Sequence, residues 1–225
     1  MTRVDAVLFD WGDTLFESPH APSVILDAAR DRGIPMAPAA ARRVWDELWE
    51  AGKSAEEHAK GRDLSREAHR RVWLDLFARA NATVPGIDRV LYDRVMDPAG
   101  WLPYPDARPT LETLRERGVR TGIVSNHVYD PGSCFAANDL DRFIDGYTLS
   151  YEVGAPKPSP LIFAAACHRL GVAAPSALMV GDDAVSDGGA VAAGLQVYIL
   201  SAHPHPPATA RGLAHVVELV DRSRA

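Results

Sequence analysis

The sequence has few cysteines, no long apolar run and no excess of basic residues. Its only cysteines, Cys134 and Cys167, are too few for a disulfide scaffold and are not spaced like metal ligands. No apolar stretch approaches the roughly 20 residues of a membrane-spanning helix. The first ten residues are too acidic for a signal peptide. From these absences we expect a cytoplasmic protein with no membrane partner.

Charge excludes a further class of partner. The chain has 30 acidic and 24 basic residues, a formal net charge of −6. General nucleic-acid binding needs a basic face that neutralises phosphates, so no nucleic-acid partner is expected. A small anionic substrate is compatible with this charge, because a bound metal or a local cation can outweigh it.

Strand-like and helix-like segments alternate over much of the 225 residues. Four apolar, β-branched runs predict buried parallel strands, at residues 4–9, 120–125, 177–180 and 196–200. Helical patterns follow at residues 107–119, 159–172, 186–195 and 210–225. This alternation predicts an α/β fold, a doubly wound parallel sheet of Rossmann-like type.

Residues 17–101 interrupt the alternation with helical periodicity alone. A block of about 85 residues is too long for a simple crossover, so we expect a separate helical cap domain inserted into the core. The core would then comprise residues 1–16 and 102–225. The charged stretch at 50–63, with Lys53 and Lys60, is typical of a solvated helix face rather than of a site with a reactive lysine.

Polar residues gather where the predicted strands end. Asp10 ends the first strand, Ser125 and Asn126 end the second, and Asp182 follows the third. Lys157 precedes a predicted helix. The carboxyl ends of parallel strands share one edge, so acids and a lysine should converge there. Oxygen ligands of this kind suit Mg²⁺, and a carboxylate can also attack phosphorus as a nucleophile.

Four segments in order resemble the motifs of the haloacid dehalogenase superfamily, in the branch whose helical cap follows the first motif. They are "VLFDWGDTL", "TGIVSN", "SYEVGAPKPSPLIFAAACHRLGV" and "ALMVGDDAVSDGGAVAAGL". Each alone would be weak, but four in the right order and spacing are specific. The likeness covers nearly the whole chain and implies a hydrolase, most simply a phosphatase acting on a small phosphorylated metabolite.

The resemblance also implies a metal site. By position, Mg²⁺ would be held by Asp10, the carbonyl of Gly12 and Asp182. Either Asp187 or Asp183 would hold a metal-bound water, and the sequence does not decide between them.

The resemblance implies roles around the phosphate as well. Asp10 would be the nucleophile, and Lys157 would neutralise charge between it and the phosphate. Ser125 would bind a phosphate oxygen, with the backbone of Asn126, and Thr14 would brace the loop. His20, where the chain enters the cap, is a candidate substrate contact.

One departure from the family pattern affects the chemistry. Phosphatases of this family usually read Asp-x-Asp-Gly-Thr, with the second Asp as general acid and base. Here Gly12 takes that position and Asp13 follows it. Three hypotheses stay open: Asp13 or a nearby histidine takes over the proton, the substrate needs no acid, or activity is lost.

The alternatives to a phosphatase are therefore a dehalogenase, a phosphonate hydrolase, or a non-catalytic ligand-binding or regulatory relative. A dehalogenase is disfavoured by the retained metal acids, and a phosphonate hydrolase by the lack of a convincing cap lysine. The sequence names no substrate, and either a monomer or a homodimer is compatible with it.

Overall fold

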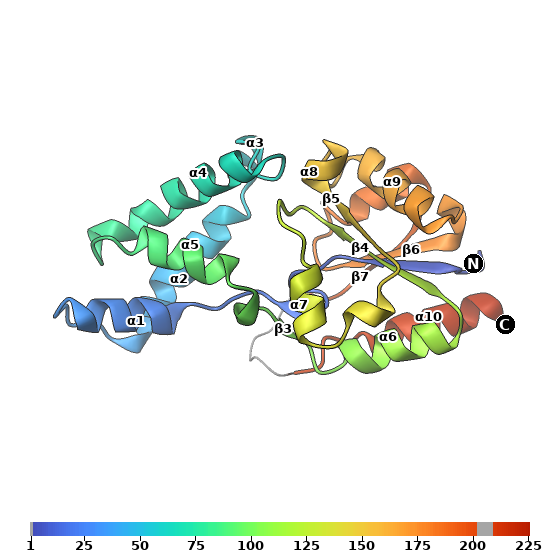
Figure 1. Ribbon diagram of the computed structural model, residues 1–225, viewed down its shortest axis with the longest axis horizontal. Helices are drawn as coiled ribbons and strands as arrows, with labels where there is room; N and C mark the ends of the chain where they lie inside the picture. The colour runs from blue at the N-terminus through green and yellow to red at the C-terminus, as the bar shows by residue number, and fades with distance from the viewer. Residues whose placement is uncertain (1, 202–208) are drawn as a thin grey trace. The chain divides into compact units, whose positions relative to one another are not determined.

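The computed structural model describes residues 2–201 and 209–225. The chain divides into two compact units: Met1–Glu17 with Trp101–Ala225, and Ser18–Gly100. We call them the core unit and the helical unit; each is seen in Figure 1. Their limits lie one residue from the boundaries expected from the sequence. That the helical unit acts as a cap stays a prediction.

The core unit contains a five-stranded parallel sheet with the order β5-β4-β1-β6-β7. The strands are β1 (Ala6–Phe9), β4 (Arg120–Ser125), β5 (Gly146–Leu149), β6 (Ala177–Gly181) and β7 (Gln196–Ile199). This arrangement confirms the doubly wound α/β fold, since strand order reverses beside the central β1. A separate antiparallel pair joins β2 (Phe16–Glu17) to β3 (Leu102–Pro103).

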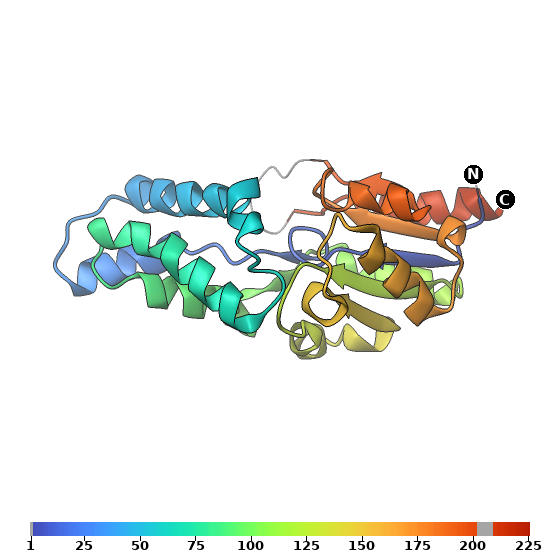
Figure 2. The same ribbon diagram turned by 90° about the horizontal axis from the view of Figure 1, so that it is seen from above.

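Helices cover both faces of this sheet because β1 is apolar on both. Val7 and Phe9 pack into one buried cluster, and Ala6 and Leu8 into another. The first cluster is completed by α6 (Ala107–Glu116), α7 (Gly132–Ala137) and α10 (Ala214–Arg224). The second is completed by α9 (Pro160–Leu170). Figures 1 and 2 show α6 and α10 on one side of the sheet and α9 on the other.

Two expectations for the core unit need correction. The sheet has a fifth strand, β5, which the sequence did not predict because this edge strand is short and half exposed at its start. The segment expected as a helix at 186–195 is instead a 3₁₀-helix, η5 (Gly188–Ala193), which begins with two glycines, poor α-helix formers. The remaining short elements are α8 (Ser150–Val153), η3 (Asp141–Phe143) and η4 (Ala174–Ser176).

The helical unit is entirely helical, as expected. Its elements are α1 (Pro22–Asp31), α2 (Pro38–Gly52), α3 (Ala55–Ala59), α4 (Arg66–Phe77), η1 (Ala78–Ala82), α5 (Asp88–Met96) and η2 (Pro98–Gly100). Its core is aromatic: Trp49 stacks on both Trp45 and Trp73, with ring centroids 5.1 and 5.6 Å apart. Among the described residues, no helix of either unit combines the length and apolar character needed to cross a membrane.

The charged stretch at 50–63 is only partly a solvated face. Lys53 and Lys60 are exposed, as expected, but Glu57, Arg62 and Asp63 are buried. Glu57 accepts hydrogen bonds from Lys60 and Arg79, and Arg62 lies over the ring of Trp73. Mutual pairing makes this burial possible, and such pairing is invisible in a local charge pattern.

Candidate active site

Three strands of the core unit bring the motif residues to one edge of the sheet. Asp10 follows β1, and its backbone N–H donates to the carbonyl of Val180 in β6, at 2.9 Å. Asp182 lies directly after β6, and Ser125 is the last residue of the neighbouring β4. The site thus lies where the strand order reverses, the usual ligand position in open α/β sheets.

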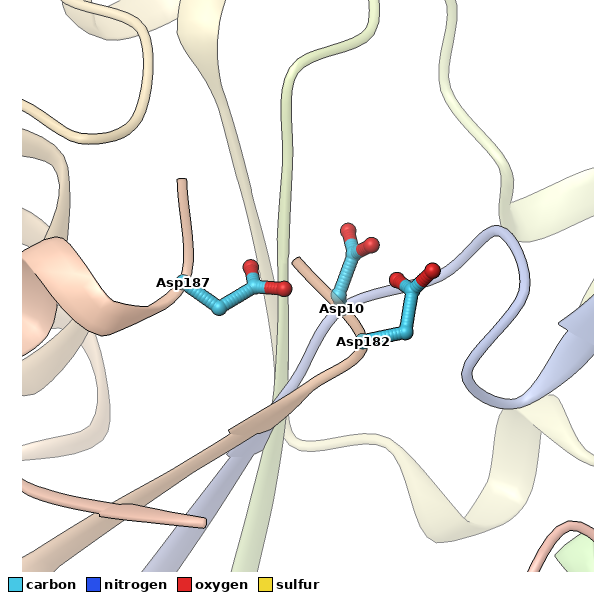
Figure 3. Close-up of side chains that lie close together, drawn as sticks. All are labelled: Asp10, Asp182 and Asp187. Carbon is cyan, nitrogen blue, oxygen red and sulfur yellow. The ribbon is translucent and has the colours of Figure 1, made fainter. Parts of the chain in front are cut away.

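Three carboxylates form the centre of the site. Asp10, Asp182 and Asp187 each offer an oxygen, and these oxygens lie within 4.8 Å of one another. In Figure 3, the Asp187 side chain points toward the carboxylates of Asp10 and Asp182. Gly181 makes room for Asp187, since a Cβ at this position would lie 2.0 Å from its Oδ2. The absence of a side chain at Gly181 therefore allows Asp187 to reach the cluster.

Lys157 bridges two of these carboxylates. Its Nζ lies 2.7 Å from Asp10 Oδ1 and 2.6 Å from Asp187 Oδ1, and the residue is only 6% exposed. Burial by itself would lower the pKa of the ammonium group, but the charges of Asp10 and Asp187 outweigh it and raise the pKa above 10.5. Lys157 is therefore a permanent buried cation on the candidate nucleophile.

The Asn126 side chain holds Lys157 in place. Its Oδ1 accepts a hydrogen bond from the Lys157 N–H at 2.7 Å, and its Nδ2 donates to the Lys157 carbonyl at 3.0 Å. The sequence resemblance assigned Asn126 a role through its backbone. The structure gives its side chain a different function, which is to link the end of β4 to the backbone of Lys157.

The carboxylates carry more negative charge than Lys157 compensates. Burial, with the charges of the other two carboxylates, raises the pKa of Asp10 to about 7 despite the opposing effect of Lys157. Burial and the charges of Asp13 and Asp187 raise the pKa of Asp182 to about 6. When all three are deprotonated, the carboxylates exceed the Lys157 ammonium group by two negative charges, which one divalent cation would neutralise. The all-oxygen donor set also fits Mg²⁺.

The other acid considered for this position lies outside the cluster. Asp183 is exposed, and its Oδ1 accepts hydrogen bonds from the N–H groups of Val185 and Ser186 at 2.7 and 2.9 Å. This is the geometry of a side chain that caps a turn. Asp187 supports the same turn, because its Oδ2 accepts from the Asp183 N–H at 3.0 Å.

The loop after β1 is tightly folded around Asp13. The Asp13 N–H donates to the carbonyl of Phe16 at 2.7 Å, and Gly12 forms an isolated bridge with the same residue. Asp13 has φ +54°, in the left-handed region. Thr14 is fully buried, and its hydroxyl lies 3.4 Å from Asp182 Oδ1 as a long hydrogen bond. Thr14 thus links the loop to the carboxylate cluster.

Two histidines follow the first two motif segments in the chain. His20 is exposed in the helical unit, where its ring packs edge-on to Trp45 with centroids 6.5 Å apart. Its contact with substrate stays a prediction. His127, in the core unit, is partly exposed, and its ring lies edge-on to Trp11 with centroids 5.0 Å apart. Trp11, directly after Asp10, also stacks on Trp101 at 4.0 Å.

Comparison with known proteins shows the family of this chain. A family model described as haloacid dehalogenase-like hydrolase matches residues 4–194. The chain belongs to this family. The hydrolase class implied by the four motifs and the α/β core expected from the alternation of strands and helices are thereby confirmed.

Relatives of this haloacid dehalogenase-like hydrolase carry different names. It is 29% identical to the ribulose-1,5-bisphosphate 5-phosphatase of Halopiger xanaduensis, over 91% of this chain and 87% of that one. It is 36% identical to phosphatase MT3486 of Mycobacterium tuberculosis, but over 43% of this chain and 46% of that one, less than half of either. The crystal structure of the L-2-haloacid dehalogenase RSc1362 has a TM-score of 0.73, with 22% identity, covering 98% of this chain and all of that one. At that identity the last likeness shows the fold alone.

Sequence reasoning missed one residue beside this hydrolase's site. Arg211 lies before α10 in a segment expected to be part of the last helix, yet it is buried and donates to the carbonyl of Asp13. No local pattern marks it, because its partner is 198 residues away in the chain.

Proposed function

We propose that this haloacid dehalogenase-like hydrolase is a Mg²⁺-dependent phosphatase that acts on a small phosphorylated metabolite through an aspartyl-phosphate at Asp10. The observation that carries the proposal is the cluster of Asp10, Asp182 and Asp187 around Lys157, in which three acids face one base. A site for a metal and a phosphate needs such acids, whereas a purely structural ion pair does not. Relatives that are named phosphatases support the same reading.

In this proposal the metal would be held by Asp10, the carbonyl of Gly12 and Asp182, with Asp187 acting through a water. When bound, Mg²⁺ would offset the charge of the carboxylates and of the phosphate. Asp187 is suited to the indirect role because both of its oxygens already accept hydrogen bonds, from Lys157 and from the backbone of Asp183. Asp183, whose Oδ1 caps the turn, is the less suitable of the two acids for that role.

The chemistry follows from Asp10 and Lys157. A carboxylate oxygen of Asp10 attacks phosphorus as the bond to the leaving-group oxygen breaks, and water later cleaves the acyl phosphate. Lys157 lies against Asp10 and would lower the repulsion between nucleophile and phosphate. Ser125 and the backbone of Asn126 would bind phosphate oxygens, and Thr14 would keep the loop against Asp182.

The first test is phosphate release from p-nitrophenyl phosphate with and without Mg²⁺. The wild type should turn over only with the metal, and Asp10→Asn should abolish turnover. Asp187→Asn should lower kcat by about 100-fold or more, whereas Asp183→Asn, one turn away and outside the cluster, should lower it less than about 5-fold. Metal-independent turnover, or full activity in a folded Asp10→Asn variant, would overturn the proposal.

The leaving group tests the missing acid at position 12. General acid catalysis is worth roughly 10² to 10⁴ in rate. If nothing replaces it, aryl phosphates should be cleaved far faster than alkyl phosphates, because only alkyl leaving groups need a proton. Restoring the usual order with Gly12→Asp and Asp13→Gly should then raise alkyl phosphate turnover. Comparable wild-type rates on both esters would instead favour Asp13 or His20 as the proton donor.

A dehalogenase is the second candidate, favoured by the fold shared with RSc1362 and by the absence of an acid at Gly12. The same Asp10 would then attack carbon instead of phosphorus. Chloride release from 2-chloropropionate in metal-free buffer would support this activity. A folded protein that binds Mg²⁺ and phosphate but releases neither product from any ester or halide would be a ligand-binding relative.

A further inference from the structure

Arg211 is a buried cation that contacts the loop carrying Gly12 and Asp13. Arg211 is only 6% exposed. Its Nε donates to the carbonyl of Asp13 at 2.7 Å, and its Nη1 donates to the carbonyl of Ser201 at 2.9 Å. The guanidinium carbon lies 5.9 Å from the centroid of the Tyr104 ring. The loop after β1 is thus tied to two other parts of the core unit.

Arg211 is itself held at the backbone. Asp106 Oδ1 accepts from the Arg211 N–H at 2.9 Å, while its Oδ2 accepts from the N–H groups of Gly212 and Leu213 at 2.8 and 2.9 Å. Hydrogen bonds to a carboxylate are stronger than neutral ones. These hydrogen bonds therefore fix the backbone at Arg211 in the position from which its side chain contacts Asp13.

The loop needs such support at Asp13. A non-glycine residue at φ +54° is strained, although aspartate tolerates this region better than most residues. Such strain persists only when surrounding contacts hold it in place. Within the loop, the Asp13 N–H is held by Phe16, and Arg211 holds the carbonyl at the other end of the same residue.

Arg224 offers a comparison within the same unit. Its Nε and Nη1 donate to the carbonyls of Val4 and Arg117, at 3.0 and 2.7 Å, so it too ties two segments of the core together. Its side chain is 19% exposed and lies at the end of α10, away from the carboxyl edge of the sheet. The Arg224 Nη2 also lies 3.8 Å from Asp5 Oδ1, whereas the Arg211 Nη2 is buried and has no hydrogen-bond partner among the described residues. Burying a guanidinium N–H in this way is unfavourable, so stability alone is a poor reason for Arg211.

We propose that Arg211 is a positioning residue of the active site: it fixes the carbonyl of Asp13, and through it the backbone of Gly12 and Asp13, beside Asp10. The kinetic consequence rests on the phosphatase function proposed above. The structural consequence, a fixed backbone at Gly12 and Asp13, does not rest on that function because it concerns the loop alone.

The structural part is tested by hydrogen exchange of the full chain, measured by mass spectrometry on peptides that cover residues 10–17. Arg211→Met should raise the exchange rate of this loop by about 10-fold or more, and Arg224→Met should leave it unchanged. Arg211→Lys keeps a donor for one of the two carbonyls and should give an intermediate exchange rate. This variant also tests the proposal if Arg211→Met does not fold. Unchanged loop exchange in a folded Arg211→Met or Arg211→Lys variant would overturn the proposal.

The kinetic part uses p-nitrophenyl phosphate with saturating Mg²⁺. Displacement of catalytic groups by about 1 Å can cost roughly 100-fold in rate, so Arg211→Met should lower kcat by about 10- to 100-fold and change KM less than about 3-fold. Arg211→Lys should recover part of kcat, and Arg224→Met should keep all of it. Equal kcat in wild type and folded Arg211→Met would refute positioning. A wild type that hydrolyses no ester would refute the phosphatase function, while the exchange comparison would still decide the role of Arg211.

Discussion

Raising the pH from 5 to 8 without metal should destabilise the folded protein through Asp10 and Asp182. Their folded-state pKa values, about 7 and about 6, lie above the ordinary value of 3.8. Between these values the folded chain binds more protons than the unfolded chain, so its free energy of unfolding falls as the pH rises. This loss of stability is nearly complete at pH 8, above both folded-state pKa values. Lys157 is protonated in both states over this range, so its contribution does not change.

The size of this effect follows from the same pKa values. From pH 5 to pH 8, the free energy of unfolding should fall by about 2–3 kcal/mol through Asp10 and by about 1–2 kcal/mol through Asp182. The Asp10 side chain is 15% exposed, so water screens part of its charge. We therefore expect a total loss of about 2–4 kcal/mol. Excess Mg²⁺ should restore stability, and more so at pH 8, where its carboxylate ligands are deprotonated.

Urea unfolding in metal-free buffer at pH 5 and pH 8 measures this loss directly. Asp10→Asn is the control, since it removes the larger of the two titrations and leaves every other group of the chain in place. The wild type should lose about 2 kcal/mol more than this variant between the two pH values. A wild type whose stability is flat or rises relative to Asp10→Asn would show that the buried charge is already compensated, and the case for a divalent cation would fail with it.

Substitutions at three positions test the supports of the site. Asn126→Ala removes both hydrogen bonds to the Lys157 backbone and should cost about 1–3 kcal/mol in urea unfolding and lower kcat, without changing the fold seen by circular dichroism. Asp13→Gly should be neutral or stabilising by up to about 1 kcal/mol, whereas Asp13→Ala should destabilise, because only glycine adopts φ +54° freely; urea midpoints for the pair decide this. Gly181→Ala should displace the Asp187 carboxylate and weaken Mg²⁺ binding at least 10-fold by calorimetry, and unchanged affinity would contradict the tight fit at that position.

The parts of the fold predicted from sequence are those set by continuous apolar runs. Strands β1, β4 and β6 are buried on both faces, so their sequences show the signature of a central parallel strand. The edge strand β5 lacks that signature, because half of it meets solvent and its pairing with β4 replaces side-chain burial as the stabilising contact. The other edge strand, β7, is also only partly buried, but it was predicted because its sequence is a continuous apolar run after Gln196.

The site was predictable to the extent that its residues follow strand ends. Asp10 and Asp182 lie one residue beyond β1 and β6, so topology alone brings them together. The contributions of Asn126 and Arg211 depend on backbone partners 31 and 198 residues away, and no local pattern encodes such contacts. Their side chains support the loops that carry the motif residues, and only the folded structure shows which loops those are.

The exchange of glycine and aspartate at positions 12 and 13 keeps the backbone path and changes the chemistry. The residue with left-handed φ is Asp13, at the position where the family pattern has glycine, so the turn is formed despite the missing glycine. Aspartate is one of the few residues that tolerate this conformation. Its carboxylate, however, is attached one residue after the position of the usual acid. The charge of Asp13 raises the pKa of Asp182. In the site proposed above, an acid whose charge acts on Asp182 would influence the binding of a metal more than the protonation of a leaving group, which favours substrates whose leaving group needs no proton.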